Sequence, residues 1–382
     1  MHLLLAIITL GAIALILYHH LAWPLILRRA ALKAPPAPRP LPRHLLPAIT
    51  LVMPAHNEAR FIARKIANLA ALDYPREQLR IIIATDGCSD ETPTIARAEL
   101  QRQGLSAELR IFAQNRGKVA VLNEIVDALR GGIVALTDVS ALLPADALKR
   151  IAAHFAEPRL GAVGGTYVLD KPGSAGEAKY WRWQVAGKRG EAALGAPLGL
   201  HGAFWAFRRE AFAPLAPDTI NDDFTLPMQM VLRGWRVGYD AGLLAREAEC
   251  SSPAQDLRRR RRIAAGNMQQ MLRLMPLLHP RHGGVAVAFL SGKALRVVMP
   301  LLILIAGLGT ALLAPHSTFF TMLAIAEIAG LLAALAGLAL GSRAPRILAL
   351  AAYALAGHAA SGMGAARYML SRPTQPWRRA AP

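Results

Sequence analysis

Long apolar stretches lie toward both ends of the chain and flank a central region with a different pattern. Residues 3–27 contain no Lys, Arg, Asp or Glu, and a helix of this length crosses a bilayer core. Further apolar stretches occupy 297–314, 319–340 and 347–370. The pattern predicts one membrane-spanning helix before the central region and about three after it.

In the central region, short β-rich runs alternate with helical patterns between about residues 49 and 168. The candidate strands are Ile49–Met53, Arg80–Ala84, Leu109–Phe112 and Ile133–Thr137. Such alternation predicts βαβ units and hence an α/β fold, a Rossmann-like domain with a mostly parallel sheet.

The pattern divides the chain into a series of segments. We expect an N-terminal transmembrane anchor over 1–28, a basic, Pro-rich spacer over 29–47 and the α/β domain over 48–275. An interfacial amphipathic segment over 276–296, C-terminal transmembrane helices over 297–370 and a basic tail over 371–382 complete the chain.

Composition supports a membrane protein. Hydrophobic residues make up 54% of the sequence, while Lys and Arg outnumber Asp and Glu by 44 to 25. A net charge of +19 also suits a nucleic-acid binder, but the sequence has no zinc-finger spacing, no RNP-type strand and no helix-turn-helix pattern. We therefore expect a lipid bilayer as partner and no nucleic acid.

Basic residues around the first apolar stretch set its orientation. Arg28 and Arg29 follow the stretch and no basic cluster precedes it, which favours an uncleaved anchor over a signal peptide. By the positive-inside rule, the α/β domain is then cytosolic, in a multi-pass protein of the cytoplasmic (inner) membrane.

The C-terminal tail disagrees with this orientation. Three crossings after a cytosolic domain would place the basic residues of 371–382 outside, against the same rule. Either the Gly-rich run 357–364 does not span the membrane, or 285–298 enters it in another way.

Polar residues follow the first two predicted strands. The first strand runs into Pro54, Asn57 and Glu58, and the second ends at Asp86. Ligands bind at this edge of open α/β sheets. We expect Asp86 to accept the N–H of a nucleotide base and Asn57 to help orient base and ribose. Asp90 belongs either to this site or to the cap of the next helix.

The next polar residues suit a phosphorylated ligand. Lys118 is at the start of a predicted helix whose N-terminus favours an anion, and Asn123 lies further along this helix. The alternative is that Gly117–Lys118 is only a structural turn before the helix. Asp138 ends the fourth strand, and Ser140 follows two residues later. Carboxylate oxygen is a suitable ligand for Mg²⁺ or Mn²⁺, which a diphosphate needs, whereas Ser140 is a poorer ligand.

The order and spacing of these segments resemble the inverting glycosyltransferases of family 2, which have the GT-A fold. The segments that carry the likeness are Pro54 to Glu58, Asp86 to Asp90, Gly117 to Asn123 and Asp138 to Ser140. The likeness extends over about 49–270, and the flanking membrane segments resemble the cellulose, chitin and hyaluronan synthase branch. It implies an enzyme that moves a sugar from a nucleotide sugar, expected to be a UDP-sugar, to a hydroxyl of a surface-glycan or lipid-linked acceptor.

The resemblance also implies roles for the acids. Asp138 matches the first acid of the family's DxD metal motif, and Ser140 departs from the second. The segment Asn221-Asp222-Asp223 resembles the TED motif, whose final Asp is the catalytic base, so this role falls on Asp223 with Asp222 beside it. The alternative is that the two acids form the N-cap and first turn of a helix.

Two further segments match the family by their order. His201 and Gly202 resemble the acceptor-facing loop, and the arginine run 258–262 falls at the QxxRW motif. There Arg259 replaces Gln, whereas Arg262 keeps its position and would stabilise the departing diphosphate. Ile263 replaces Trp, which leaves polymerisation in doubt.

Two other functions fit the same sequence. One is a non-catalytic, nucleotide-sugar-binding membrane subunit of a polysaccharide synthase, an alternative that Ser140, Arg259 and Ile263 keep open. The other is a polyprenyl-phosphate sugar transferase. The expected partners are the nucleotide-sugar donor, a glycan or lipid-linked acceptor and, for a synthase, an export or synthase protein.

Overall fold

The computed structural model describes residues 2–169, 175–247 and 253–371, which form two compact units. The α/β unit contains Leu27–Ser252 and Leu274–Ala286. The helical unit contains Met1–Ile26, Pro253–Arg273 and Val287–Pro373.

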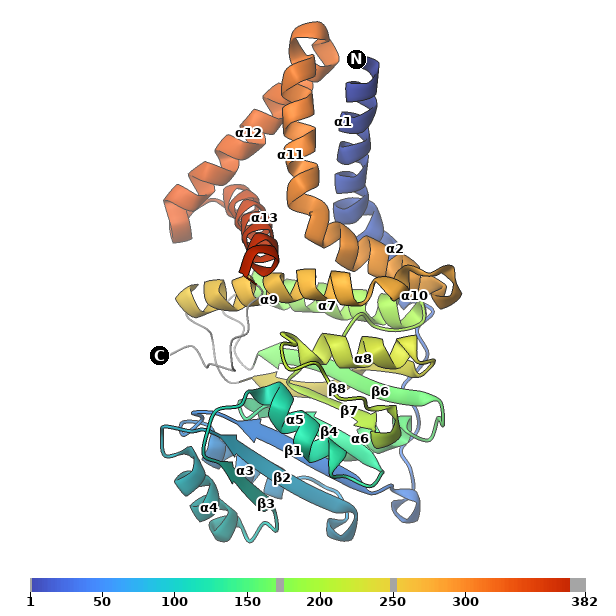
Figure 1. The fold of residues 1–382 in the computed structure, drawn as a ribbon, viewed down its shortest axis with the longest axis vertical. Coiled ribbons are helices and arrows are strands. Elements are labelled where there is room, and N and C mark those ends of the chain that lie inside the picture. Colours follow the sequence, from blue (N-terminus) through green and yellow to red (C-terminus); the bar gives the residue numbers. More distant parts are fainter. Residues whose placement is uncertain (1, 170–174, 248–252, 372–382) are drawn as a thin grey trace. The chain divides into compact units, whose positions relative to one another are not determined.

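An eight-stranded sheet with the order β3-β2-β1-β4-β7-β6-β8-β5 forms the centre of the α/β unit (Figure 1). Its strands are β1 (Ile49–Ala55), β2 (Leu79–Asp86), β3 (Glu108–Phe112), β4 (Ile133–Thr137), β5 (Ala141–Leu142), β6 (Leu160–Leu169), β7 (Phe204–Arg208) and β8 (Arg236–Glu247). Strands β3, β2, β1 and β4 are parallel, and β7 is antiparallel to both of its neighbours. The predicted α/β fold and its four predicted strands are therefore confirmed.

Helices connect the strands along the chain. They are α3 (Ile62–Ala70), α4 (Thr92–Gln103), α5 (Lys118–Asp127), α6 (Ala147–His154), α7 (Ala175–Ala193) and α8 (Asp222–Leu232). In α3, Ile62, Ile66 and Leu69 recur at helical spacing and are completely buried in the core of the unit. Because α3, α4 and α5 are crossovers between parallel strands, the carboxyl ends of β1, β2 and β4 share one edge of the sheet.

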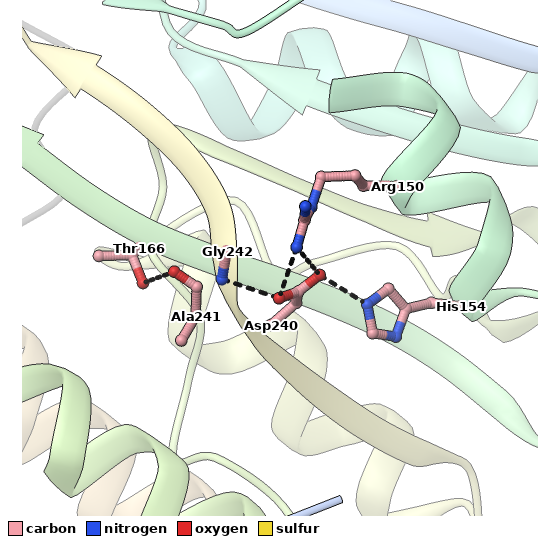
Figure 2. A network of polar contacts seen from close by, with 6 residues as sticks. All are labelled: Arg150, His154, Thr166, Asp240, Ala241 and Gly242. Carbon is pink, nitrogen blue, oxygen red and sulfur yellow. Dashed lines mark hydrogen bonds and ion pairs between the residues drawn. The ribbon is translucent and has the colours of Figure 1, made fainter. Parts of the chain in front are cut away.

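A polar network fixes an irregular part of β8 (Figure 2). The pairing of β6 with β8 shifts register between Gly164 and Thr166, where the hydroxyl of Thr166 donates to the carbonyl of Ala241 at 3.1 Å. Beyond this shift, the end of β8 pairs with β5, which directly follows Asp138 to Ser140. Through this pairing with β5, the end of β8 lies next to the segment expected to hold a metal ion.

Asp240 is the buried centre of this network. Its carboxylate accepts hydrogen bonds from Nε2 of His154 at 3.0 Å and from the N–H of Gly242 at 2.8 Å, and lies 3.4 Å from the guanidinium of Arg150. Burial favours a higher pKa for Asp240, but these hydrogen bonds and the charges of His154 and Arg150 hold the pKa below its ordinary value. The ionised carboxylate therefore stabilises the fold at neutral pH.

We predict that Asp240→Asn lowers the free energy of unfolding by about 2 kcal/mol, because charge-assisted hydrogen bonds are lost. The midpoint of thermal unfolding in detergent measures this effect. Glu157→Gln is the matched control, since its pair with Arg236 is exposed and such pairs contribute little. Equal destabilisation by both variants would contradict the role of Asp240.

The helical unit is built from long apolar helices. Its elements are α1 (His2–Leu17), a π-helical turn (Tyr18–Ala22), the start of α2 (Trp23–Ala31), α9 (Pro253–Arg273), the end of α10 (Gly284–Ala288), a second π-helical segment (Phe289–Ala294), α11 (Leu295–Leu313), α12 (Thr318–Leu340) and α13 (Arg346–Ser371). Among the described residues, four helical stretches are long and apolar enough to cross a membrane: His2–Ala31, Gly284–His316, Thr318–Leu340 and Arg346–Leu370. The expected interfacial segment 276–296 is not an element of its own, because its second half continues into α11.

Helices α1 and α11 are antiparallel neighbours (Figure 1). At one end, the rings of His2 and His316 lie 4.4 Å apart. At the other end, the hydroxyl oxygens of Tyr18 and Ser291 are 2.8 Å apart. We call these the distal end and the proximal end of the helical unit.

The middle of α13 lies at the proximal end. The ring of His358 contacts that of His20 at 5.2 Å between centroids, and Gly362 faces Pro300 near the start of α11. Gly364 lies against Ala264 of α9. In Figure 1, α13 is strongly foreshortened, whereas α1 and α11 are seen from the side. Helix α13 therefore does not extend alongside α1 and α11 toward the distal end.

Candidate active site

Four charged side chains meet at the carboxyl edge of the parallel strands. Lys118 begins α5, Asp138 follows β4, and Asp222 and Asp223 begin α8. Nζ of Lys118 lies 3.2 Å from Oδ1 of Asp138 and 3.5 Å from Oδ2 of Asp222, and the charge of Asp223 also acts on it. The structure thus brings together the predicted metal-binding and catalytic acids around one ammonium group.

The protonation of Lys118 follows from these neighbours. Burial alone would lower the pKa of Lys118, but the charges of Asp138, Asp222 and Asp223 raise it above its ordinary value of 10.5. The side chain is therefore a cation at neutral pH. Because it carries one positive charge among three acids, the site keeps a surplus of negative charge.

The two adjacent acids have different environments. Asp222 is buried and faces Lys118, whereas Asp223 is only half-buried. No side chain caps α8 at Asn221 in the described structure, so the acids occupy the first turn, where the helix dipole favours negative charge. Asp223 is the more accessible carboxylate of the pair.

The predicted acceptor loop passes beside Asp223. A Cβ atom added to Gly202 would lie 3.0 Å from Oδ2 of Asp223, so the absence of a side chain leaves that oxygen room. The N–H of Leu200 donates to the backbone oxygen of Asp223 at 2.8 Å, which fixes the loop against α8. His201 stacks on Tyr167, with 4.5 Å between ring centroids.

Asp138 and Ser140 are both partly exposed, whereas Val139 between them is buried in the core. The carboxylate of Asp138 is 42% exposed and therefore accessible to a ligand. Within the described residues, no group of three His, Cys, Asp or Glu side chains could hold a metal ion. One carboxylate and one hydroxyl nevertheless fit Mg²⁺ or Mn²⁺ if a diphosphate and water supply the other oxygen ligands.

Lys65 is a residue of the site that the sequence interpretation missed. It is completely buried, and its ammonium group donates to the hydroxyl of Thr137 at 2.7 Å and to the carbonyl of Ala141. It therefore supports the backbone on both sides of Asp138. The signal was present in the sequence, because Lys65 falls on the same helical stripe as Ile62 and Ile66.

Asp86 has a different environment from the one expected. Its side chain is completely buried, and both carboxylate oxygens accept backbone N–H groups of Arg116 and Gly117 at 2.8–3.1 Å. In this structure Asp86 holds the loop after β3 against the end of β2. Its contact with a nucleotide base stays a prediction.

The loops after β1 and β2 are also joined. Asn57 adopts a left-handed conformation, with a φ of 54°, which asparagine tolerates better than most residues. Its side-chain oxygen accepts the N–H of Ser89 at 2.8 Å, and His56 donates to the carbonyl of Asp86 at 2.7 Å. The three loops form a connected rim at the sheet edge.

The start of α4 completes this rim. Asp90 accepts the N–H groups of Thr92 and Ala59 at 3.0 and 3.1 Å and so joins the first residue of α4 to the loop after β1, whereas the N-cap position of α4 is Glu91. The N–H of Glu58 donates to the hydroxyl of Thr92 at 2.7 Å. Pro54 is buried within β1 and contributes to the rim only through the backbone.

Among the other predicted residues, Asn123 is not brought to the site. The side-chain amide of Asn123 bonds both backbone groups of Leu215, at 2.8 and 3.0 Å, and so joins α5 to a neighbouring loop. Arg262 is exposed on α9 in the helical unit. The side chain of Arg259 lies outside the described residues.

A comparison with known families decides the affiliation. The family described as "Glycosyltransferase like family 2" matches residues 47–266. The chain belongs to this family. The match contains every strand of the sheet and all four members of the charged cluster, so the site described above lies within the glycosyltransferase domain.

Individual glycosyltransferases are similar over the same region. The beta-monoglucosyldiacylglycerol synthase of Synechocystis sp. is 28% identical over 59% of this chain and 49% of its own length. The poly-beta-1,6-N-acetyl-D-glucosamine synthase of Staphylococcus aureus is 28% identical over 51% of this chain and 48% of its own length. The chain thus spans about half the length of these curated relatives.

A solved structure extends the similarity to nearly the whole chain. The mannosyltransferase PcManGT from Pyrobaculum calidifontis, in complex with GDP-Man and Mn²⁺, is 25% identical. The likeness covers 93% of this chain and 98% of that one, with a TM-score of 0.69. The GT-A fold expected from the sequence is therefore confirmed.

The buried Lys65 generates a pH-dependent prediction. Burial lowers the pKa of Lys65 from 10.5 to about 7, although the charges of Asp138 and Glu247 oppose the shift. Between about pH 7 and 10 the unfolded chain therefore binds more protons than the folded one, so stability rises with pH over this range. We expect Lys65→Met to remove this rise, measured as the unfolding midpoint across pH 6.5–9.5.

The control for this experiment is Lys149→Met, which removes an exposed lysine paired with Asp73 at 2.5 Å. It should keep the wild-type dependence on pH. A wild-type slope in Lys65→Met would show that Lys65 is not the group responsible.

Proposed function

We propose that this chain is a membrane-bound, inverting glycosyltransferase that moves a sugar from a nucleotide sugar to a hydroxyl of a lipid-linked or glycan acceptor. The observation that carries this proposal is the meeting of Asp138, Asp222 and Asp223 around Lys118 at the ligand-binding edge of the sheet. The similar proteins named for glucosyldiacylglycerol and poly-N-acetylglucosamine synthesis support both acceptor classes.

The donor would bind along the rim of the sheet. The loops that carry Asn57, Glu58 and Asp86 would receive the base and ribose, and the diphosphate would then face Lys118. A UDP-sugar is the proposed donor, with a GDP-sugar as alternative because PcManGT was solved with GDP-Man. Lys118 is suited to a phosphate oxygen because its ammonium group stays protonated.

Asp138 and Ser140 would hold Mg²⁺ or Mn²⁺, and this ion's charge would offset that of the departing diphosphate. The Mn²⁺ in PcManGT supports such an ion here. By the family resemblance, Arg262 and Arg259 would add guanidinium groups to the same leaving group.

Asp223 would be the catalytic base. As the acceptor oxygen forms its bond to the anomeric carbon, the bond from that carbon to the diphosphate breaks, and the acceptor proton passes to the Asp223 carboxylate. Asp223 suits this role because it is half-buried and lies beside Gly202, in the loop proposed to face the acceptor together with His201. Asp222, buried against Lys118, is better placed to position that lysine.

The test of this proposal is release of nucleoside diphosphate by the purified protein with UDP-glucose, UDP-N-acetylglucosamine and GDP-mannose in the presence of Mn²⁺. We expect release with one donor and a fall of roughly 10²- to 10⁴-fold in Asp223→Asn, because proton removal is lost. The control is Asp127→Asn. Asp127 is the last residue of α5, at the opposite end of the helix from Lys118, and its carboxylate pairs with Arg209.

Each failure has its own meaning. No release with any donor would leave the non-catalytic subunit as the better description. Undiminished release by Asp223→Asn would remove the base assignment while keeping the enzyme. Turnover that requires a polyprenyl phosphate would identify the alternative transferase.

We also propose three membrane crossings, by α1, α11 and α12, with α13 on the cytosolic side of the membrane. The contacts of His358, Gly362 and Gly364 at the proximal end support this path. The basic residues after α12 then lie on the cytosolic side, as the positive-inside rule requires, so the conflict found in the sequence disappears.

Reporter fusions test this topology in bacterial cells. Green fluorescent protein fused after Pro382 should fluoresce, and alkaline phosphatase at the same place should be inactive, because both reporters remain in the cytosol. Insertions at Ser317, between α11 and α12, should give the opposite pair of results. Active phosphatase at the C-terminus would mean that α13 crosses the membrane.

A further inference from the structure

Three basic side chains form a partly exposed surface at the proximal end of the helical unit. They are His20, Arg296 and His358, which we call the proximal cluster. The rings of His20 and His358 meet edge to face at 5.2 Å, and Arg296 is close enough for its charge to act on both. The cluster thus combines residues from α11, α13 and the π-helical turn after α1.

Two π-helical segments build this surface. Tyr18–Ala22 follows α1, and Phe289–Ala294 precedes α11. The hydroxyls of Tyr18 and Ser291 are 2.8 Å apart, and Nδ1 of His19 donates to the carbonyl of Ser291 at 2.7 Å. These bonds join the two segments and leave the neighbouring His20 exposed. Short π-helical segments are uncommon and frequently occur at functional sites.

The described part of the helical unit contains little negative charge to balance this cluster. Glu327 is the only acid whose side chain is described there, and its carboxylate accepts a hydrogen bond from Thr310 at 3.3 Å. The His358 ring lies against His20 and within reach of the charge of Arg296, both of them basic residues. An anion beside the cluster would accept N–H groups from these side chains.

We propose that the proximal cluster binds the phosphate of an anionic lipid. His20 and Arg296 are exposed, and the half-buried His358 lies between them and the helix core. Leu17 and Leu21, which flank His20 along the chain, are 52% and 60% exposed and offer apolar surface to an acyl chain. A lipid provides both the phosphate and the chain, whereas free phosphate provides only the first.

The position of the cluster agrees with this ligand. It lies at the end of α1 that leads to Arg28 and Arg29, the side where anionic lipid headgroups attract basic residues. The proposal concerns lipid binding alone and holds whether or not Asp223 is the catalytic base.

The test uses the full chain, delipidated in detergent, and measures the thermal shift on titration with dioleoylphosphatidylglycerol. The parallel probes are dioleoylphosphatidylcholine, which has no net charge, and inorganic phosphate. We expect phosphatidylglycerol to stabilise the wild type, and Arg296→Gln or His358→Asn to weaken this apparent affinity roughly tenfold. Arg343→Gln is the matched control, because it removes an exposed arginine outside the cluster.

The outcomes are distinct. Equal weakening by Arg343→Gln, or an equal shift with phosphatidylcholine, would overturn the proposal in favour of general attraction to the lipid surface. An equal shift with inorganic phosphate would replace the lipid by a free anion. If Arg296→Gln does not fold, His20→Asn replaces it, and we expect the same weakening of the apparent affinity for phosphatidylglycerol. Unchanged affinity in both His20→Asn and His358→Asn would overturn the proposal.

Discussion

A single ammonium group, that of Lys118, holds together acids from distant parts of the chain. Without it, Asp138 after β4 and Asp222 at the start of α8 would be neighbouring carboxylates with no cation between them. Their arrangement requires α5, β4 and α8 to meet at one edge of the sheet. The contacts that build the candidate active site therefore form only when these three elements have folded together.

A second lysine supports the same segment from inside. Lys65 holds the chain before and after Asp138 by hydrogen bonds to Thr137 and Ala141, while Lys118 faces its carboxylate. The backbone that carries Asp138 is thus fixed before any ligand arrives. Preorganised charges of this kind contribute most where water is excluded, because they need no rearrangement as charge develops in the reaction.

The sequence predicted the parallel half of the sheet but not the other half. Strands β1 to β4 alternate with helices and leave a clear pattern, whereas β5 has two residues and β8 shifts register around a polar network. For the candidate site, the sequence predicted which polar residues follow the ends of the strands. It did not predict the partners of Asp86 and Asn123, because these partners are backbone groups that only tertiary structure brings near.

Apolar length alone does not decide whether α13 crosses a membrane, because close contacts with other helices also constrain its path. Its length and composition suit a crossing, yet a side chain at Gly364 would overlap Ala264 of α9, with a Cβ–Cβ distance of 2.3 Å. Gly337 of α12 likewise allows Leu348 to approach. Small residues permit such close helix contacts in membranes, where van der Waals packing drives association. Gly362 and Gly364 of α13 thus permit its close contacts with Pro300 and Ala264.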